Sequence, residues 1–204
     1  MKDLEYRFKS SVLKIFNAWI LFMSVCLRSI VLLPTLKVLQ MRVPKCFKQF
    51  SDTRVILDCT EICVQSPSSL ENKSLTYSSY KSHDTFKALI GVSTTGAVVF
   101  VSKLWPGCTS DVEITRCSGL YNQLEKGDAV MVDKGFIHIQ PDLRPKGVKL
   151  YCPPFNTKVQ FSKTEVEMTR RIASARIHVE RKMEQIKNFI IANLLIMFFL
   201  FVQH

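Results

Sequence analysis

Three acidic residues stand at positions from which their carboxylates can act together. Asp58 closes a β-branched, apolar run at residues 54–58, and Asp133 closes a similar run at residues 129–133. Glu180 lies within a helical pattern, one row away from its apolar stripe. If the two strands are neighbours and the helix packs over them, the three carboxylates meet at one edge of a sheet. Asp58, Asp133 and Glu180 are therefore candidate ligands of a metal site.

Carboxylate oxygens are hard ligands that suit Mg²⁺ or Mn²⁺. Two such ions about 4 Å apart can clamp the attacking and leaving oxygens of an in-line displacement at phosphorus. One ion then activates water or a 3′-hydroxyl, and the other neutralises the leaving 3′-oxygen. A single acid at a strand end is usually a turn residue, and a helical Glu near Arg and Lys is usually a solvated ion-pair partner. Only the joint pattern predicts phosphoryl-transfer chemistry.

The elements around the acids predict an α/β fold. Apolar and β-branched runs predict strands at residues 54–58, 87–93, 97–104, 129–133 and 149–152, with a hairpin turn at residues 94–96 and a Ser-rich loop at residues 65–80. Residues 61–65 could continue the first strand. Ser110 or Asp111 would cap a short helix that runs to Leu124. The order of these elements predicts a mixed sheet flanked by helices.

A long helix begins at the capping box Ser162–Glu165. Its apolar stripe consists of Ile172, Ala175, Val179, Met183, Ile186 and Ile190. A second helical segment is expected at residues 5–33, and Pro34 and Pro44 mark a linker that runs to about residue 50.

Composition limits the partners. The chain has 204 residues, a net charge of +11 and a pI near 9.4, which favours a polyanion such as nucleic acid over an anionic membrane. Its seven scattered cysteines include no Cys-x-x-Cys pair, as expected for reduced thiols rather than a disulfide framework or a zinc site. Apolar runs at residues 15–27 and 189–202 are shorter than the ~20 residues that a spanning helix needs. We expect a nuclear and cytoplasmic protein, with membrane association as the minor alternative.

The chain resembles the Harbinger-type DDE superfamily endonucleases, in the THAP-associated branch of the DDE transposases. Six stretches carry the resemblance, in family order: RVILDCTE (54–61), YKSHDTFKALIG (80–91), GAVVFVS (96–102), GCTSDVEIT (107–115), GDAVMVDKGF (127–136) and RIHVER (176–181). A helical Tyr-x2-Arg-x3-Glu-x6-Lys signature of related transposases is matched by Arg176, Glu180 and Lys187. Ala173 stands where that signature has its tyrosine.

The resemblance implies an RNase H-like fold and a metal-dependent DNA endonuclease that hydrolyses phosphodiester bonds and transfers strands. It assigns Asp58, Asp133 and Glu180 as the catalytic, metal-binding acids, with Mg²⁺ or Mn²⁺ as cofactor. Asp111 is a rival for the second acid, because the Ser110-Asp111 pair is also a family hallmark. We prefer Asp133, since Asp111 fits a helix cap whereas Asp133 closes a buried strand.

Further side chains are expected around these acids. Glu61 and His83 are candidates for an outer shell that supports the site. The expected DNA contacts are Lys81, Lys87, Arg176 and Lys187. Such phosphate contacts are independent of sequence and sensitive to salt.

The expected organisation has three parts. Residues 1–41 form a helical segment, partly like a helix-turn-helix, with its linker; residues 42–191 form the catalytic domain; and residues 192–204 form an apolar tail outside the family pattern. We therefore expect a truncated chain. Loss of catalysis through this truncation is the alternative to an active enzyme. The alternative is a domesticated or truncated relative that binds DNA or a partner without cutting. DNA is the expected partner, with room for a separate DNA-binding protein and for a homo-oligomer.

Overall fold

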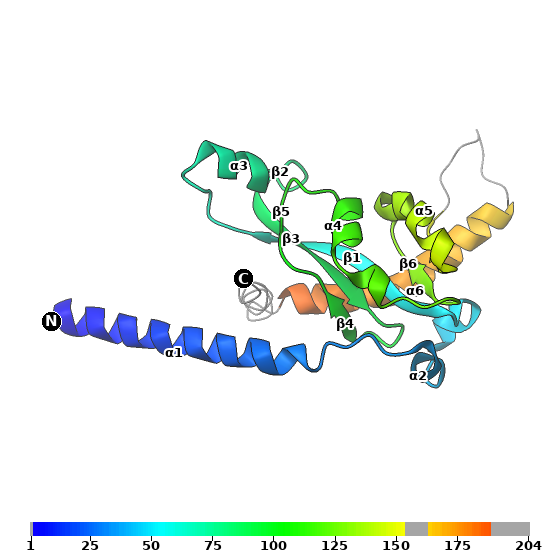
Figure 1. Ribbon diagram of the computed structural model, residues 1–204, viewed down its shortest axis with the longest axis horizontal. Helices are drawn as coiled ribbons and strands as arrows, with labels where there is room; N and C mark the ends of the chain where they lie inside the picture. The colour runs from blue at the N-terminus through cyan, green and yellow to red at the C-terminus, as the bar shows by residue number, and fades with distance from the viewer. Residues whose placement is uncertain (1, 154–162, 189–204) are drawn as a thin grey trace.

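The residues around the candidate acids form one mixed β-sheet, shown in a computed structural model that describes residues 2–153 and 163–188 (Figure 1). The central strand β1 pairs antiparallel with β3 and parallel with β6. Strand β7 continues the sheet parallel to β6, while β2, β4 and β5 all pair with β3. The strands are β1 (Thr53–Cys63), β2 (Tyr77–Ser78), β3 (His83–Val92), β4 (Val98–Val101), β5 (Trp105–Pro106), β6 (Ala129–Met131) and β7 (Lys149–Tyr151).

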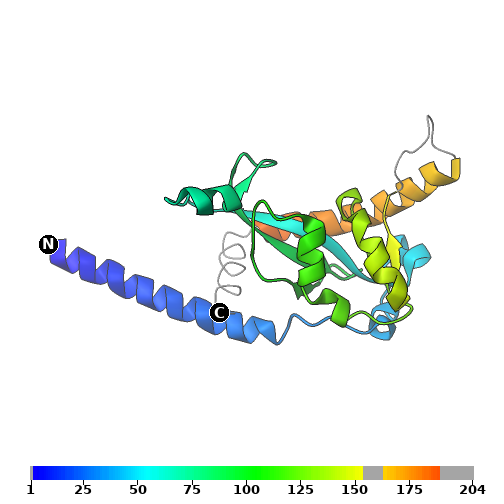
Figure 2. The ribbon, with the colours of Figure 1, turned by 45° about the horizontal axis from the view of Figure 1, so that its top comes forward.

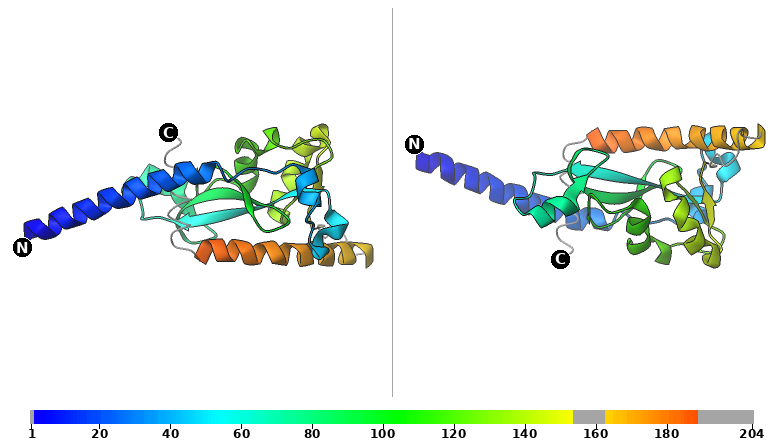
Figure 3. Two further views of the ribbon diagram at one scale, coloured as in Figure 1. Left: turned by 90° about the horizontal axis from the view of Figure 1, so that it is seen from below. Right: turned by 90° about the horizontal axis from the view of Figure 1, so that it is seen from above.

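Helices cover both faces of this sheet (Figure 3). Alternate side chains of β1 point to opposite faces, so Val55 and Leu57 enter one apolar core and Ile56 enters the other. The first core is closed by α4 (Asp111–Cys117) and α5 (Gln140–Leu143), and the second by α6 (Lys163–Asn188). The predicted α/β class, a mixed sheet flanked by helices, is confirmed. The architecture is consistent with an RNase H-like fold.

The long helix α6 packs against the sheet through part of the predicted stripe. Ile172 and Ala175 are buried in the second core, as expected. The side chains of Val179, Met183 and Ile186, the residue Ile190 and the start of the capping box at Ser162 lie outside the described part of the chain.

Predicted elements away from the acids differ from the structure in three places. The Ser-rich segment is not only a loop, because Ser69 caps α3 (Leu70–Thr76) by accepting a hydrogen bond from the backbone N–H of Asn72. The strand predicted at residues 97–104 is shorter, since β4 ends at Val101, and a separate strand, β5, follows it and pairs with another part of β3. Helix α4 ends at Cys117 rather than Leu124, because Gly119 adopts a positive φ of +80° and turns the chain.

Several short helices complete the described chain. They are α2 (Leu36–Gln40) and the 3₁₀ turns η1 (Lys45–Phe50), η2 (Leu120–Asn122), η3 (Lys134–Ile139) and η4 (Arg144–Lys146). Turn η1 lies against α6, where Phe47 and Phe50 join the second core. The linker between Pro34 and residue 50 is thus partly helical.

The N-terminal helix α1 (Lys2–Arg28) extends away from the sheet in Figure 1 and Figure 2, and the predicted helix in this region is confirmed. Ile20 is buried, whereas Trp19 and Phe22 on another face are 59% and 61% exposed. None of the helices within residues 2–153 and 163–188 combines the length and the apolar character needed to cross a bilayer.

Candidate functional site

Asp58 lies in the middle of β1 rather than at its end. The strand expected at residues 54–58 continues into the segment that begins at Glu61, because β3 supplies an antiparallel partner as far as Cys63. The parallel neighbour β6 is shorter, however, and its last paired residue is Met131, opposite Ile56. Asp58 and Asp133 each follow that pair by two residues. The two acids therefore lie where β6 has ended and β1 continues.

Asp133 is the N-cap of η3. Its Oδ1 atom accepts a hydrogen bond of 2.7 Å from the backbone N–H of Lys134, and Nη1 of Arg176 lies 2.8 Å from the same oxygen. Burial opposes the ionisation of Asp133, but the Lys134 N–H and the charge of Arg176 outweigh it and lower the pKa of Asp133. The carboxylate is thus held ionised at neutral pH.

Arg176 also contacts the third acid. Its Nη2 atom lies 3.4 Å from Oε1 of Glu180, one turn further along α6. The side chain of Arg176 is only 12% exposed, whereas those of Asp133 and Glu180 are 58% and 59% exposed. The guanidinium therefore sits beneath two carboxylates that remain accessible to solvent.

A second group of charges surrounds Lys87 on β3. Its Nζ atom lies 3.5 Å from Oδ1 of Asp111 and 3.7 Å from Oε1 of Glu61, and it donates a hydrogen bond of 3.2 Å to the carbonyl of Thr109. Ser110 is the N-cap of α4, as one of the two predicted alternatives has it, and Asp111 is the first residue of the helix. Asp111 and Asp133, the two candidates for the second acid, thus both stand at the start of a helix. The expectation that only Asp111 has this position is wrong.

The two groups lie toward opposite faces of the sheet. Asp58 is paired across the strands with Ile90, which belongs to the core beneath α6. Cys59 is paired with Leu89, which belongs to the core beneath α4. Cross-strand partners point to the same face, so Asp58 lies on the α6 face, as Arg176 does, and Cys59 on the α4 face.

One pocket of about 620 Å³ joins the two groups around the end of β6. The residues that line it are Asp58, Cys59, Thr60, Glu61, Tyr80, Lys81, Lys87, Asp111, Asp133, Arg176 and Glu180. Five carboxylates and three basic groups give this lining a formal charge of −2. Such a charge favours the entry of a cation.

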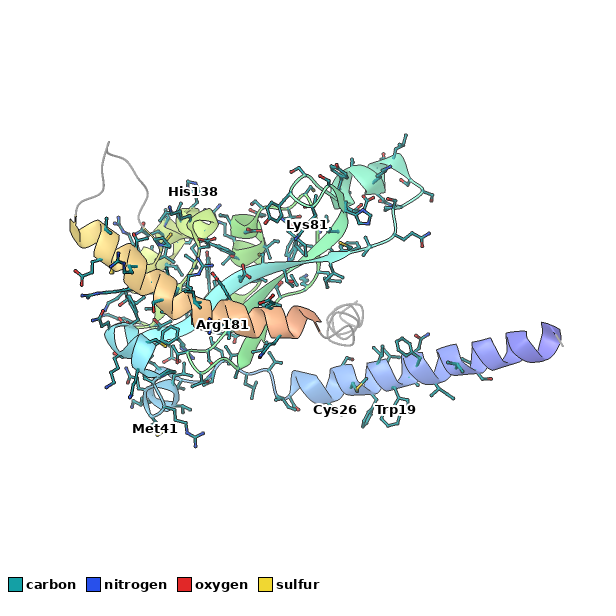
Figure 4. All side chains as sticks on the ribbon, turned by 180° about the vertical axis from the view of Figure 1, so that it is seen from behind. Trp19, Cys26, Met41, Lys81, His138 and Arg181 are labelled. Atoms are coloured by element: carbon teal, nitrogen blue, oxygen red, sulfur yellow. The ribbon has the colours of Figure 1, made fainter. Side chains whose placement is uncertain are left out.

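Most of the predicted site residues therefore meet in one place. The three acids, Asp111, Glu61, Lys81, Lys87 and Arg176 all line the pocket. In the view of Figure 4, the C-terminal half of α6 lies between Lys81 and Met41. His83 is exposed at the start of β3 and is not part of the lining, and the side chain of Lys187 lies outside the described residues.

Sequence reasoning missed three lining residues: Cys59, Thr60 and Tyr80. Cys59 adjoins an acid on a strand, so it carried a positional signal, and Tyr80 opens one of the resemblance stretches. Burial, followed by the nearby carboxylate of Asp111, raises the pKa of the Cys59 thiol far above its usual value. The thiol is therefore protonated and is unsuited to act as a thiolate ligand or nucleophile.

The chemistry of the lining fits a hard divalent cation, because all of its acidic groups are oxygen donors. Within residues 2–153 and 163–188, no three His, Cys, Asp or Glu side chains are grouped closely enough to hold a metal ion. Arg176 contacts two of the acids instead. The donors are thus of the right type, and four of them, Glu61, Asp111, Asp133 and Glu180, are paired with basic side chains.

Comparison with known proteins assigns the family. Residues 57–195, more than half of the chain, match the family described as DDE superfamily endonuclease. A search of curated proteins gave no significant match, and neither did a search of solved structures. The matched range includes every lining residue of the pocket, and the mixed sheet is consistent with the family's fold. The chain belongs to the DDE superfamily endonucleases, a family of transposase-type nucleases that act on DNA and generally use divalent metals.

Proposed function

We propose that this chain is a Harbinger-type transposase endonuclease of the THAP-associated branch, in which Asp58, Asp133 and Glu180 hold Mg²⁺ or Mn²⁺. It would hydrolyse DNA phosphodiester bonds and transfer strands by a two-metal mechanism, acting on nuclear DNA. The observation that carries the proposal is the pocket at the end of β6. There, β1, the start of η3 and helix α6 each contribute one of these acids to the same lining.

The arrangement supports Asp133 rather than Asp111 as the second acid. Asp58 lies on the α6 face of β1, and Asp133 and Glu180 are both joined to Arg176 of that helix. Asp111 lies across the sheet edge, where Lys87 already pairs with it. Asp58, Asp133 and Glu180 therefore lie toward the same face of the sheet, and we infer that they form the better ligand set.

The chain's own groups have separate tasks in this proposal. Arg176 restrains Asp133 and Glu180 from beneath, so that their free oxygens face the pocket. Lys81 and Lys87 supply positive charge for the phosphodiester, which would otherwise be repelled by the carboxylates. Bound divalent metal would supply Lewis-acid activation of the attacking hydroxyl and charge neutralisation at the leaving oxygen.

A plasmid-nicking assay tests the proposal. Purified full chain is incubated with supercoiled plasmid and Mg²⁺ or Mn²⁺, beside the variants Asp133→Ala and Glu180→Ala. We expect each variant to lose more than about a hundredfold in nicking rate, because a metal ligand is lost. Asp142→Ala is the matched control, since this carboxylate pairs with Arg116 on the surface and does not line the pocket.

The outcomes separate the candidate functions. Nicking that survives both substitutions would contradict the assignment of the site. Loss of nicking in Asp111→Asn but not in Asp133→Ala would make Asp111 the second acid. Salt-sensitive DNA binding without any nicking would favour a relative that binds DNA but does not cut it.

A further inference from the structure

A short arm, formed by α3, β2 and the turn into β3 (residues 70–84), stands at one end of the sheet (Figure 1). Tyr80 lies in its turn and is 83% exposed, more than any other described aromatic residue. A ring this exposed contributes little to packing. Yet Tyr80 is among the residues that line the same pocket as Asp58 and Glu180. The ring is therefore placed at the candidate active site without a structural reason.

The backbone of the arm holds the turn that carries Tyr80 in a defined conformation. Ser82 has a φ of +52°, in the left-handed region that residues other than glycine rarely adopt. The backbone N–H of the residue after Tyr80 donates a hydrogen bond of 3.3 Å to Oγ of Ser78. At the base of the turn, the buried Asp84 accepts a hydrogen bond of 2.8 Å from the Thr76 hydroxyl. These contacts fix the turn before any ligand arrives.

The ring has a cation beside it. Nζ of Lys81 lies 5.2 Å from the centre of the Tyr80 ring, within the range of a cation–π contact. That contact uses one face of the ring and leaves the other face for a flat ligand. An aromatic face next to a lysine matches a ligand with a π-system and a neighbouring anion. Nucleotides have this combination, with a base that can stack and a phosphate that can pair with the ammonium.

We propose that Tyr80 stacks on an unpaired nucleobase of the DNA while Lys81 pairs with the adjoining phosphate. An unpaired base is the favoured ligand, because in the interior of a duplex stacked neighbours cover both faces of each base. The proposal rests on the proposed function, since the phosphodiester in the pocket brings the base to the arm. It adds that the enzyme favours strand ends and distorted steps over intact duplex, independent of base sequence.

Equilibrium binding to two DNA probes tests this. One probe is a duplex with a three-nucleotide unpaired 3′ end that carries 2-aminopurine, and the other is the same duplex fully paired. Binding is measured with EDTA present, so that cleavage does not intervene. The full chain is compared with Tyr80→Ala, Tyr80→Phe and the matched control Tyr77→Ala. Tyr77 is an exposed tyrosine of the same arm that does not line the pocket.

We expect Tyr80→Ala to weaken binding of the unpaired probe about tenfold, because one stacking contact is lost. Binding of the paired probe should change less than twofold. Tyr80→Phe and Tyr77→Ala should bind as the wild type does, since stacking requires the ring of Tyr80 but not its hydroxyl. The wild type and Tyr80→Phe, but not Tyr80→Ala, should quench the 2-aminopurine fluorescence.

Wild-type affinity of Tyr80→Ala for the unpaired probe would overturn the stacking proposal alone. So would an equal loss for both probes, which would make Tyr80 a general contact. If the wild-type chain binds neither probe and does not nick plasmid, the proposed function itself fails. The two failures are therefore distinguishable.

Discussion

The guanidinium of Arg176 lies 2.8 Å from the carboxylate of Asp133 and so joins the middle of α6 to the end of β6. The arginine is largely buried while its partner is half-exposed. We expect Arg176→Met to lower the free energy of unfolding by roughly 1–3 kcal/mol, as is typical for the loss of hydrogen bonds to a charged group. Urea denaturation followed by circular dichroism measures this change.

Arg171 provides the control for that measurement. It lies on the same helix, is exposed and pairs with Glu167 one turn away. Exposed pairs of this kind contribute little, so Arg171→Met should change the unfolding free energy by less than about 0.5 kcal/mol. Equal effects of the two substitutions would mean that Arg176 does not join α6 to the sheet.

The start of β1 contains a buried ion pair that links distant segments. Arg54 is 2.6 Å from Asp128 and donates a hydrogen bond of 2.9 Å to the carbonyl of Pro34. Asp128→Ala leaves the arginine charge buried with only the exposed Glu125 as a carboxylate partner. We expect a loss of about 3–5 kcal/mol in unfolding free energy. The control Glu125→Gln, at a side chain that is 70% exposed, should cost less than about 1 kcal/mol.

Gly107 follows β5 at a site with no room for a side chain. A Cβ atom there would lie 2.3 Å from Oγ1 of Thr85 and 2.4 Å from the carbonyl oxygen of Thr76. Gly107→Ala should therefore displace β5 from β3 and lower the thermal midpoint, at a cost of about 1–3 kcal/mol or more. Gly135→Ala is the matched control, since its nearest atom would be 3.9 Å away. A wild-type thermal midpoint in Gly107→Ala would contradict the close packing of Gly107 against Thr85 and Thr76.

Asp84 at the base of the arm predicts a pH effect. Hydrogen bonds from the hydroxyls of Ser66 and Thr76 lower the pKa of Asp84. A carboxyl whose pKa is lower in the folded state stabilises the fold above its unfolded pKa, about 3.9, and this contribution is lost as the pH falls through the folded pKa. The stability difference between wild type and Asp84→Asn should thus be full at pH 6 and shrink below about pH 4. A difference that stays constant from pH 6 to pH 2.5 would rule out this origin.

The sequence was sufficient for five of the seven strands of the sheet and for most of the pocket lining. Apolar runs located β6 and the hairpin of β3 and β4, and a helical apolar stripe located α6, because those segments carry the residues that they bury. The acids were chosen by their joint spacing and by a family resemblance rather than by any one motif. Their arrival in one pocket depends on strand order, which the alternation of strands and helices restricts to few solutions.

What local patterns did not predict depends on partners that are distant in the chain. β1 continues past Asp58 because β3 lies beside it, and residues 54–58 alone carry no sign of that neighbour. Lys87 pairs with Glu61 and Asp111, which are 24 or more residues away in the chain. These ion pairs depend on how the strands are aligned in the folded sheet, which local patterns do not predict. By contrast, the serine cap of α3 was visible at Ser69 and was overlooked within a Ser-rich segment.

The alternation of side chains along β1 also limits which changes of length this domain can accept. Deleting one residue between Val55 and Asp58 would exchange the faces on one side of the deletion, so either the apolar residues or the acid would be turned to the wrong face. A substitution in β1 can preserve which face each side chain points to, but the insertion or deletion of a single residue there cannot. The turn at residues 94–96, which only connects β3 to β4, can lengthen without moving the acids. Libraries that vary loop lengths should therefore sample that turn and leave the length of β1 unchanged.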